Sequence, residues 1–270
     1  MKNLSKIGCW MIFLLGAGQG FASPVDLNLW TAESYPAVSG FSPGVWTVDS
    51  AGVTVKQTIN GQPTLFYSDF NAFGTKVTGN ITVNGGDDDF IGFVLGFHGG
   101  DTTNTAADYL LVDWKSVDQN FNFGTPSSSP GGIAPAGLAV SRVTGIPDAD
   151  EFWQHDNLSG TDAGSGLTEL ARGATLGNTG WVYGVTYGFT FDFGPNNLQV
   201  YVDNVLQLDI TGTFNNGSLG FYNFSQANVT YSAFEKDPGS FNTPEPATLA
   251  LMGIGLMGLG LCKRRRLLEY

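Results

Sequence analysis

The chain has 270 residues and a formal net charge of −12, with 38 glycines, 20 phenylalanines and only 13% charged residues. This composition excludes a disordered tail and a coiled coil, because the chain combines many aromatic side chains with many turn-forming glycines. It predicts one sandwich-type domain with terminal appendages, since two full domains would be a tight fit.

The N-terminus has the pattern of a secretory signal peptide. Lys2 and Lys6 form a basic region, Trp10 to Leu15 form an apolar segment, and small residues follow at the expected cleavage point. We therefore predict export, with cleavage between Ala22 and Ser23.

The exported chain is expected to open with a loosely patterned arm, after which regular alternation begins. Val53, Val55 and Ile59 share one face of a predicted strand. Asn60-Gly61 follows, and this pair is typical of a two-residue hairpin turn. We therefore expect a hairpin about Asn60-Gly61.

Three adjacent carboxylates, Asp87, Asp88 and Asp89, precede the most apolar strand of the chain. Residues 90–97, FIGFVLGF, are typical of a strand buried on both faces, and a polar loop joins them to a second strand at residues 109–115. Carboxylates crowded beside such a strand are stabilised by a hard cation, and Ca²⁺ prefers oxygen ligands. The triplet is the candidate metal site. The alternative is a solvated acidic turn.

Residues 116–180 are the least regular part of the chain, and loops this long usually bind something or move. One cluster in this part combines aromatic, imidazole and carboxylate side chains: Phe152, Trp153, His155 and Asp156. Such side chains suit a sugar site, but a tryptophan that covers an edge of the core is the other interpretation.

Alternation returns after Trp181, where Phe189, Phe191 and Phe193 share one face of a strand. A hairpin is predicted about Asp203-Asn204. Helix signals are nearly absent, and the only candidate for a helical turn is LTELAR. This succession of short strands predicts an all-β sandwich of two antiparallel sheets.

Catalysis is not expected from this sequence. Between residues 23 and 244 the glutamates are few and far apart: Glu33, Glu151, Glu169 and Glu235. A jelly-roll glucanase needs two carboxylates that face one cleft, and the nearest candidate, DADEFW, lies in an irregular segment. His98 and His155 are too few for a zinc site or a catalytic triad, and each is expected in a solvated loop.

The C-terminus carries a second targeting pattern. Pro244, Glu245 and Pro246 precede the apolar residues 247–262, and four basic residues follow at 263–266. At ~1.5 Å per residue the apolar run reaches roughly 24 Å, which is short of a hydrocarbon core of about 30 Å. A single-pass anchor with a cytoplasmic basic cluster is one interpretation.

This tail also resembles the PEP-CTERM sorting signal of Gram-negative bacteria that make exopolysaccharide. The resemblance rests on Pro-Glu-Pro, the short glycine-containing apolar helix and the terminal arginine cluster. It implies recognition and cleavage by an exosortase, with contact to the membrane only transiently through residues 247–262.

Removal of both targeting segments leaves a strongly acidic protein. Residues 23–244 contain 22 acidic and six basic residues, a formal balance of −16. Nucleic acid and anionic membranes are therefore excluded as partners, because no basic stripe exists to bind phosphates. Cys9 and Cys262 both lie in the removed segments, so no disulfide is expected.

Several motifs in order resemble the carboxy-terminal, lectin-like domain of thrombospondins. They are VKQTINGQPTL at 55–65, DDDFIGFVLGF at 87–97, YLLVDWK at 109–115 and LGFYNFSQ at 219–226. The resemblance implies a concanavalin A-like jelly roll and Ca²⁺ in an extracellular setting. Of the family's acidic positions, it carries over to Asp87, Asp88 and Asp89.

We therefore expect five segments: a signal peptide at 1–22, an arm at 23–43, the sandwich at 44–235, a linker at 236–243 and a sorting segment at 244–266. The first functional hypothesis is a secreted, non-catalytic, calcium-binding, lectin-like module, sorted by an exosortase to the envelope or exopolysaccharide (biofilm) matrix and adhesive there. The second is a carbohydrate-binding matrix protein in which calcium is only structural. The third is a glycan hydrolase.

Overall fold

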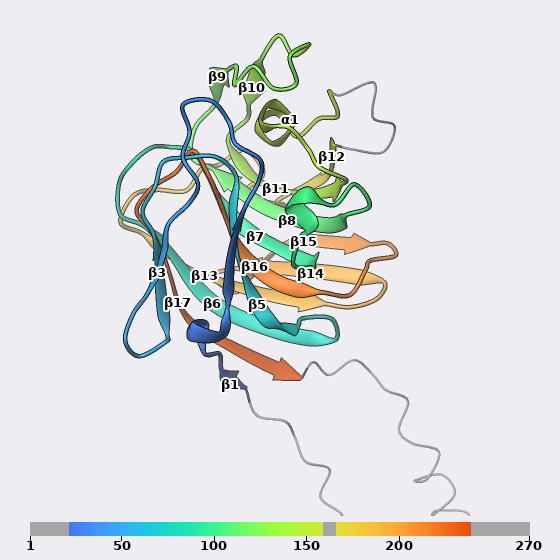
Figure 1. The fold of residues 1–270 in the computed structure, drawn as a ribbon. Helices are drawn as coiled ribbons and strands as arrows, with labels where there is room; N and C mark the ends of the chain where they lie inside the picture. The colour runs from blue at the N-terminus through green and yellow to red at the C-terminus, as the bar shows by residue number, and fades with distance from the viewer. Residues whose placement is uncertain (1–21, 159–165, 239–270) are drawn as a thin grey trace, which may run out of the picture.

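The computed structural model describes residues 22–158 and 166–238, which form two packed antiparallel sheets (Figure 1). The eight-stranded sheet follows the order β15 (Val205–Thr211), β14 (Asn197–Val202), β13 (Thr186–Phe193), β6 (Thr75–Val83), β17 (Val229–Pro238), β4 (Thr54–Gln57) and β3 (Trp46–Val48), with β1 (Ser23–Pro24) paired to β17. The seven-stranded sheet follows the order β12 (Gly166–Arg172), β11 (Gly137–Thr144), β8 (Asp108–Lys115), β7 (Phe90–Phe97), β16 (Ser218–Phe224), β5 (Thr64–Asn71) and β2 (Thr31–Ser34). The predicted all-β jelly-roll sandwich is confirmed.

Five short elements complete the described part of the chain. They are the 3₁₀ turns η1 (Leu27–Leu29) and η2 (Asp101–Thr103), the helix α1 (Ala149–Gln154), and the separate two-stranded ribbon of β9 (Gln119–Phe121) and β10 (Gly132–Ala134). Helix α1 and the β9–β10 ribbon lie together at one end of the molecule (Figure 1).

Aromatic side chains dominate the core between the two sheets. Phe93 of β7 lies at its centre, with its ring centroid 4.6 Å from that of Phe191 and 4.9 Å from that of Phe189. The predicted shared face of β13 is confirmed, because Phe189, Phe191 and Phe193 are all buried in this core. Trp114 also packs there, with 1% of its surface exposed.

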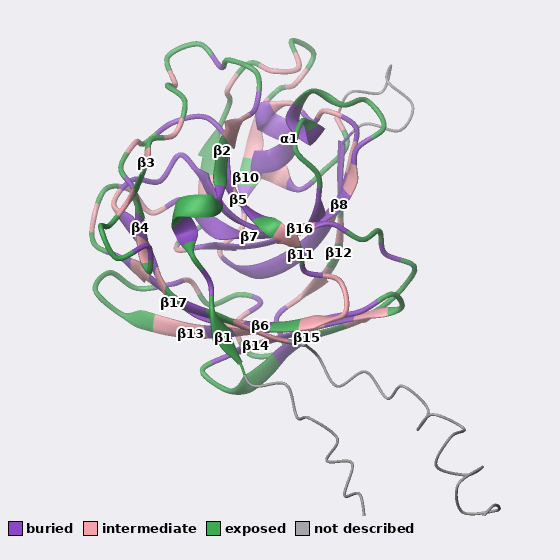
Figure 2. Cartoon of the chain, turned by 60° about the horizontal axis from the view of Figure 1, so that its bottom comes forward, coloured by how far each residue is buried: buried purple, intermediate pink, exposed green. Residues whose placement is uncertain are grey.

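The central strands β7, β8 and β16 of the seven-stranded sheet are buried on both faces, and α1 packs on the face that points away from the other sheet (Figure 2). Tyr109 and Leu111 of β8 pack in this second core with Trp153 of α1. Side chains alternate along a strand, so Asp113 and Lys115 face α1 as well. The fold thus forces two charged residues of β8 into a buried layer.

The predicted hairpins had different outcomes. Residues 90–97 and 109–115 pair as β7 and β8, and the turn at Asp203-Asn204 joins β14 to β15, so these two hairpins are confirmed. The hairpin about Asn60-Gly61 is wrong, because β4 and β5 belong to different sheets. The chain turns there from one layer to the other, and Gly61 lies against the backbone of Ser42.

The LTELAR segment is a strand, not a helical turn. It forms β12, which pairs with β11 at the edge of the sheet. Its leucines and alanine suit a helix in isolation, but cross-strand pairing decides the conformation.

Both ends of the described chain lie at one side of the sandwich. Ser23 pairs with Lys236 through β1 and β17. The segment 23–43, expected as an arm, contributes an edge strand to each sheet. The predicted signal peptide, except for Ala22, and the predicted sorting segment at 244–266 lie outside the described residues, as do both cysteines. Within the described residues no helix has the length and apolarity needed to cross a membrane.

Candidate functional site

The structure brings the three predicted metal ligands together in the turn between β6 and β7. Each of Asp87, Asp88 and Asp89 offers a carboxylate oxygen within 4.8 Å of the others. Asp87 and Asp88 are half-buried, whereas Asp89 has 1% of its surface exposed. The triplet is therefore not a fully solvated acidic turn.

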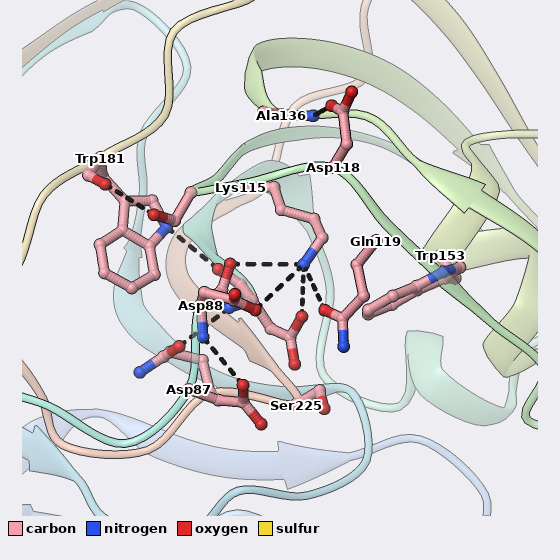
Figure 3. A network of polar contacts seen from close by, with 12 residues as sticks. Asp87, Asp88, Lys115, Asp118, Gln119, Ala136, Trp153, Trp181 and Ser225 are labelled. Atoms are coloured by element: carbon pink, nitrogen blue, oxygen red, sulfur yellow. Dashed lines mark hydrogen bonds and ion pairs between the residues drawn. The ribbon is translucent and has the colours of Figure 1, made fainter.

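Lys115 of β8 lies beneath the triplet with no exposed surface. Its ammonium group donates to the Asp89 carboxylate, to the backbone carbonyl of Asp88 at 3.3 Å and to Gln119 Oε1 at 3.0 Å. It also lies 4.6 Å from the ring centroid of Trp153. Figure 3 shows it between Asp88 and Gln119. An ammonium group has three N–H donors, and these contacts use all of them.

Burial sets the electrostatics of Asp89. Desolvation raises the pKa of this carboxyl to about 6, although the neighbouring Lys115 ammonium partly offsets the effect. Asp88 Oδ1 is buried without a hydrogen-bond partner and lies 3.8 Å from Lys115 Nζ. A buried carboxylate oxygen without a partner is costly, so this atom is suited to a cation.

The triplet fits a calcium ion in charge and in donor type. Three carboxylates against one ammonium leave a formal charge of −2 on these four side chains. Asp87 accepts from Asn60 Nδ2 at 2.8 Å and from the Asp88 amide at 3.0 Å. A carboxylate has about four lone-pair sites, so Asp87 keeps capacity for a metal. Ca²⁺ binds six to eight oxygens, and water would supply those that these side chains do not.

A pocket of about 220 Å³ opens beside the triplet. Its aromatic wall consists of Phe41, Phe121, Phe123 and Trp153. Its polar lining consists of Asn60, Asp87, Asp89, Gln119 and Ser225. Two of the three aspartates thus form part of a larger, mixed aromatic and polar surface.

The β9–β10 ribbon positions the aromatic wall. Phe121 is 40% exposed, and its ring centroid lies 4.6 Å from that of Phe123. The Trp153 indole donates to the carbonyl of Gly132 at 3.2 Å, which ties α1 to β10. Asp150 of α1 accepts from the Phe123 amide at 2.8 Å. The ring faces are therefore held in place by a helix and a strand.

The sequence held one signal for this wall that was missed. Gln119, Phe121 and Phe123 alternate along QNFNF, so their side chains share one face. The other interpretation of Trp153 is confirmed, because it is 1% exposed and packs against Phe90 and Phe224. It lines the pocket as well.

His155 is not a solvated loop histidine, so that expectation is wrong. Its ring nitrogens lie 2.9 Å from Asp113 Oδ2 and 3.1 Å from Glu169 Oε2, beneath the surface. Burial alone would lower the pKa of His155, but the ion pairs with Asp113 and Glu169 outweigh it and raise the pKa to about 9. His98, by contrast, has a 58% exposed side chain, as expected.

Comparison with known families gives two matches. The family described as "Thrombospondin C-terminal region" matches residues 42–237, and the PEP-CTERM protein-sorting motif matches residues 242–266. The second match indicates an exported protein that is sorted through this tail.

Among curated proteins, the chain is similar to Thrombospondin-3b of Danio rerio, with 27% identity over 198 residues. These residues cover 69% of this chain and 20% of that protein. It is also similar to the cartilage oligomeric matrix protein of Bos taurus, with 25% identity over 69% of this chain and 24% of that protein. The chain thus spans about a fifth to a quarter of the length of these relatives.

Two solved structures illustrate the structural likenesses. The carbohydrate-binding module CBM66 from Bacillus subtilis has 12% identity and a TM-score of 0.47, over 77% of this chain and 95% of that one. The VIP36 exoplasmic/lumenal domain in its Ca²⁺/Man2-bound form has 13% identity and a TM-score of 0.48, over 80% of this chain and 84% of that one.

Proposed function

Because this chain belongs to the thrombospondin C-terminal region family, we propose that it is an exported, non-catalytic module that binds carbohydrate in the pocket beside the aspartate triplet. The observation that carries this proposal is the composition of that pocket. The partly exposed ring of Phe121 lines one hollow together with the Asp87 carboxylate and the Gln119 amide.

The chemistry of a sugar ring matches this lining. The apolar faces of a pyranose pack on aromatic rings, while its hydroxyls donate to carboxylates and exchange hydrogen bonds with amides. Ligand sites commonly combine apolar walls with a few polar groups held in fixed positions. Here the Lys115 ammonium donates to Gln119 Oε1, and the Asp150 carboxylate accepts from the backbone amide of Phe123. These contacts hold part of the lining in place.

We further propose that Asp87, Asp88 and Asp89 bind Ca²⁺. Asp88 Oδ1, which is buried and accepts no hydrogen bond, supports this role, as does the net negative charge of the cluster. Asp89 would share its carboxylate between the metal and Lys115. The ion would brace the turn that carries Asp87 into the pocket, so calcium is structural for sugar binding in this proposal.

The absence of catalysis also belongs to the proposal. Three of the four glutamates already have structural partners: Glu33 accepts from Gly100 and Thr102, Glu151 caps α1, and Glu169 pairs with His155 and Arg172. Asp87 and Asp89 face the pocket together, and Asp89 has a raised pKa, so hydrolysis is the alternative. Release of reducing sugar from the producer's own polysaccharide would establish that alternative.

For the destination of the protein, the sorting motif supports cleavage near Pro244-Glu245-Pro246 by an exosortase. We propose that the processed chain, from Ser23 to the region of that motif, resides in the envelope or exopolysaccharide matrix of a Gram-negative bacterium. Adhesion through matrix glycans is the role that fits a pocket of this kind.

A glycan array, run with calcium and with chelator, tests the function. We expect binding that Phe121→Ala weakens by about 1 kcal/mol or more, since the exposed ring supplies the apolar contact. Leu206→Ala is the matched control, because Leu206 is 38% exposed on the edge strand β15, away from the pocket. Absence of binding to any glycan, or equal loss in both variants, would overturn the proposal.

A further inference from the structure

We propose that the pocket beside the aspartate triplet selects uncharged and amino sugars and rejects uronates and sulfated sugars. The inference rests on the proposed carbohydrate-binding function and deepens it, because it names the class of ring that the pocket takes. It follows from the hydrogen-bond donors, hydrogen-bond acceptors and charged groups that a ligand contacts in the pocket.

The charged groups that face the pocket are acceptors. The carboxylates of Asp87 and Asp89 line it, and neither can donate a hydrogen bond when ionised. Such groups favour a ligand that brings donors, namely hydroxyls or an ammonium group. A ligand carboxylate or sulfate brings only acceptors, together with a charge of the same sign.

In the part of the chain that the structure describes, no basic side chain in the pocket offsets this charge. None of the described residues that line the pocket is a lysine, arginine or histidine. Lys115 lies just beneath, but it has no exposed surface, and its three N–H donors are directed to Asp89, the Asp88 carbonyl and Gln119. It therefore neutralises part of the charge of Asp89 and cannot form an ion pair with a ligand.

The side-chain amides of Asn60 and Gln119 offer few N–H donors to an anionic sugar ring. Asn60 Nδ2 already donates to Asp87 at 2.8 Å, and Gln119 is anchored through its Oε1 to Lys115 at 3.0 Å. Ser225 Oγ contacts Asn60 Oδ1 at 3.2 Å. A neutral donor that remains available compensates a ligand charge much less than a cation does. A desolvated anion beside Asp87 would stay unpaired.

Calorimetry with three tetrasaccharides tests this selectivity: β-1,4-linked glucosamine, its N-acetylated form, and mannuronate. The full chain is used in a detergent that has no sugar head group, once with calcium and once with chelator. We expect the glucosamine and N-acetylated tetramers to bind at least tenfold more tightly than mannuronate with chelator. They should remain the tighter ligands with calcium, by a smaller factor, because an ion on the triplet would offset part of the carboxylate charge.

Two variants with the same change of net charge distinguish the local effect of the pocket from the electrostatic field of the whole protein. Asp87→Asn is expected to reduce the ratio of glucosamine affinity to mannuronate affinity several-fold; this ratio is the gap compared below. Asp209→Asn removes an exposed carboxylate from β15 on the other sheet and is expected to leave the gap unchanged. Equal narrowing in both variants would assign the selectivity to the acidic protein as a whole and overturn the inference.

The outcomes also separate this inference from the proposed function. Mannuronate that binds as tightly as glucosamine, with calcium or without it, contradicts the selectivity and leaves carbohydrate binding intact. Failure of all three tetramers to bind, together with an empty glycan array, removes the function itself and the selectivity with it.

Discussion

At the scale of single residues, Lys115 carries the largest predicted effect. Its removal leaves the Asp89 carboxylate buried without a counter-charge, and loss of one partner of a buried ion pair costs about 3–5 kcal/mol. We expect Lys115→Met to lower the free energy of unfolding by about this amount in a urea titration. Lys56→Met, at an exposed position of β4, should change it little.

A double variant, Lys115→Met with Asp89→Leu, checks the cause of that loss. It removes both charges, so it should recover a large part of the stability that the single variant loses. A double variant as unstable as Lys115→Met would mean that packing, not the unpaired charge, is responsible.

His155 gives a prediction about pH. Its pKa is raised from 6.5 in the unfolded chain to about 9 in the fold, so the folded state binds the proton more tightly. The resulting stabilisation is fully present below pH 6.5 and is lost as pH rises through 9. It amounts to on the order of 3 kcal/mol. Urea titrations between pH 6 and pH 9.5 would measure it.

The matched controls use both histidines. The double variant His155→Gln with Asp113→Asn should flatten the decline of stability over this range, because it removes the titrating imidazole together with the buried Asp113 carboxyl, which would otherwise lose its counter-charge. His98→Gln should keep it, since that side chain is exposed. A decline that persists in the double variant would mean that another group is responsible.

Single residues also mark the limit of sequence analysis at this site. Asp87, Asp88 and Asp89 were recognisable because they are adjacent. Lys115 and His155 were not, because Asp89 lies 26 residues from Lys115, and Asp113 lies 42 residues from His155. Only the pairing of strands and the position of α1 bring these charges together.

At the scale of elements, the close approach of β7 and β8 depends on Gly92. A Cβ atom at this position would lie 2.3 Å from the Val112 carbonyl oxygen and 2.7 Å from the Asp113 Cα. Both are backbone atoms, so a strand must move. We expect Gly92→Ala to destabilise the fold by about 1–3 kcal/mol or more, as overpacking does, measured by thermal and urea unfolding.

Gly188 of β13 supplies the control for this variant. A Cβ atom there would meet nothing closer than 3.6 Å, which is ordinary contact. Gly188→Ala should therefore be nearly neutral. Equal losses in the two variants would show that glycine flexibility in strands, and not the spacing of β7 and β8, sets the cost.

Elements also show where local patterns mislead. Apolar patterning predicted β7, β8 and β13 well. Residues 90–97 form a continuous apolar run, as expected of a strand buried on both faces, whereas alternation marked β8 and β13. Asn60-Gly61 carried a strong hairpin signal and yet turns the chain between layers. A turn signal locates a reversal, but the partner of the next strand is decided by the global packing of the sheets.

At the scale of the whole molecule, the pocket lies far from the ends of the described residues, near Ser23 and Pro238. The pocket lies near Ser225, just before β17 begins, and β17 ends at Pro238 beside β1. Ten residues of strand at ~3.3 Å each separate these points by about 30 Å. A chain tethered through its C-terminal tail would therefore present the pocket away from the tether.

Calcium should stabilise the whole fold if the triplet binds it. A ligand that binds only the folded state at a hundred times its Kd adds about 2.7 kcal/mol, which raises Tm. We expect Asp88→Asn to weaken calcium binding by roughly 1 kcal/mol or more in calorimetry, while Asp209→Asn leaves it unchanged. An unchanged titration for Asp88→Asn would remove the triplet from the site.

The most direct test of the account is a crystal structure of the full chain with the glucosamine tetrasaccharide and calcium. We predict a sugar ring against Phe121, its donors directed to Asp87, with the Lys115 ammonium still bound to Asp89 beneath it. A ring seated instead on the outer face of the eight-stranded sheet, in the polar cleft lined by Asn80 and Asp203, would contradict the assignment of the pocket.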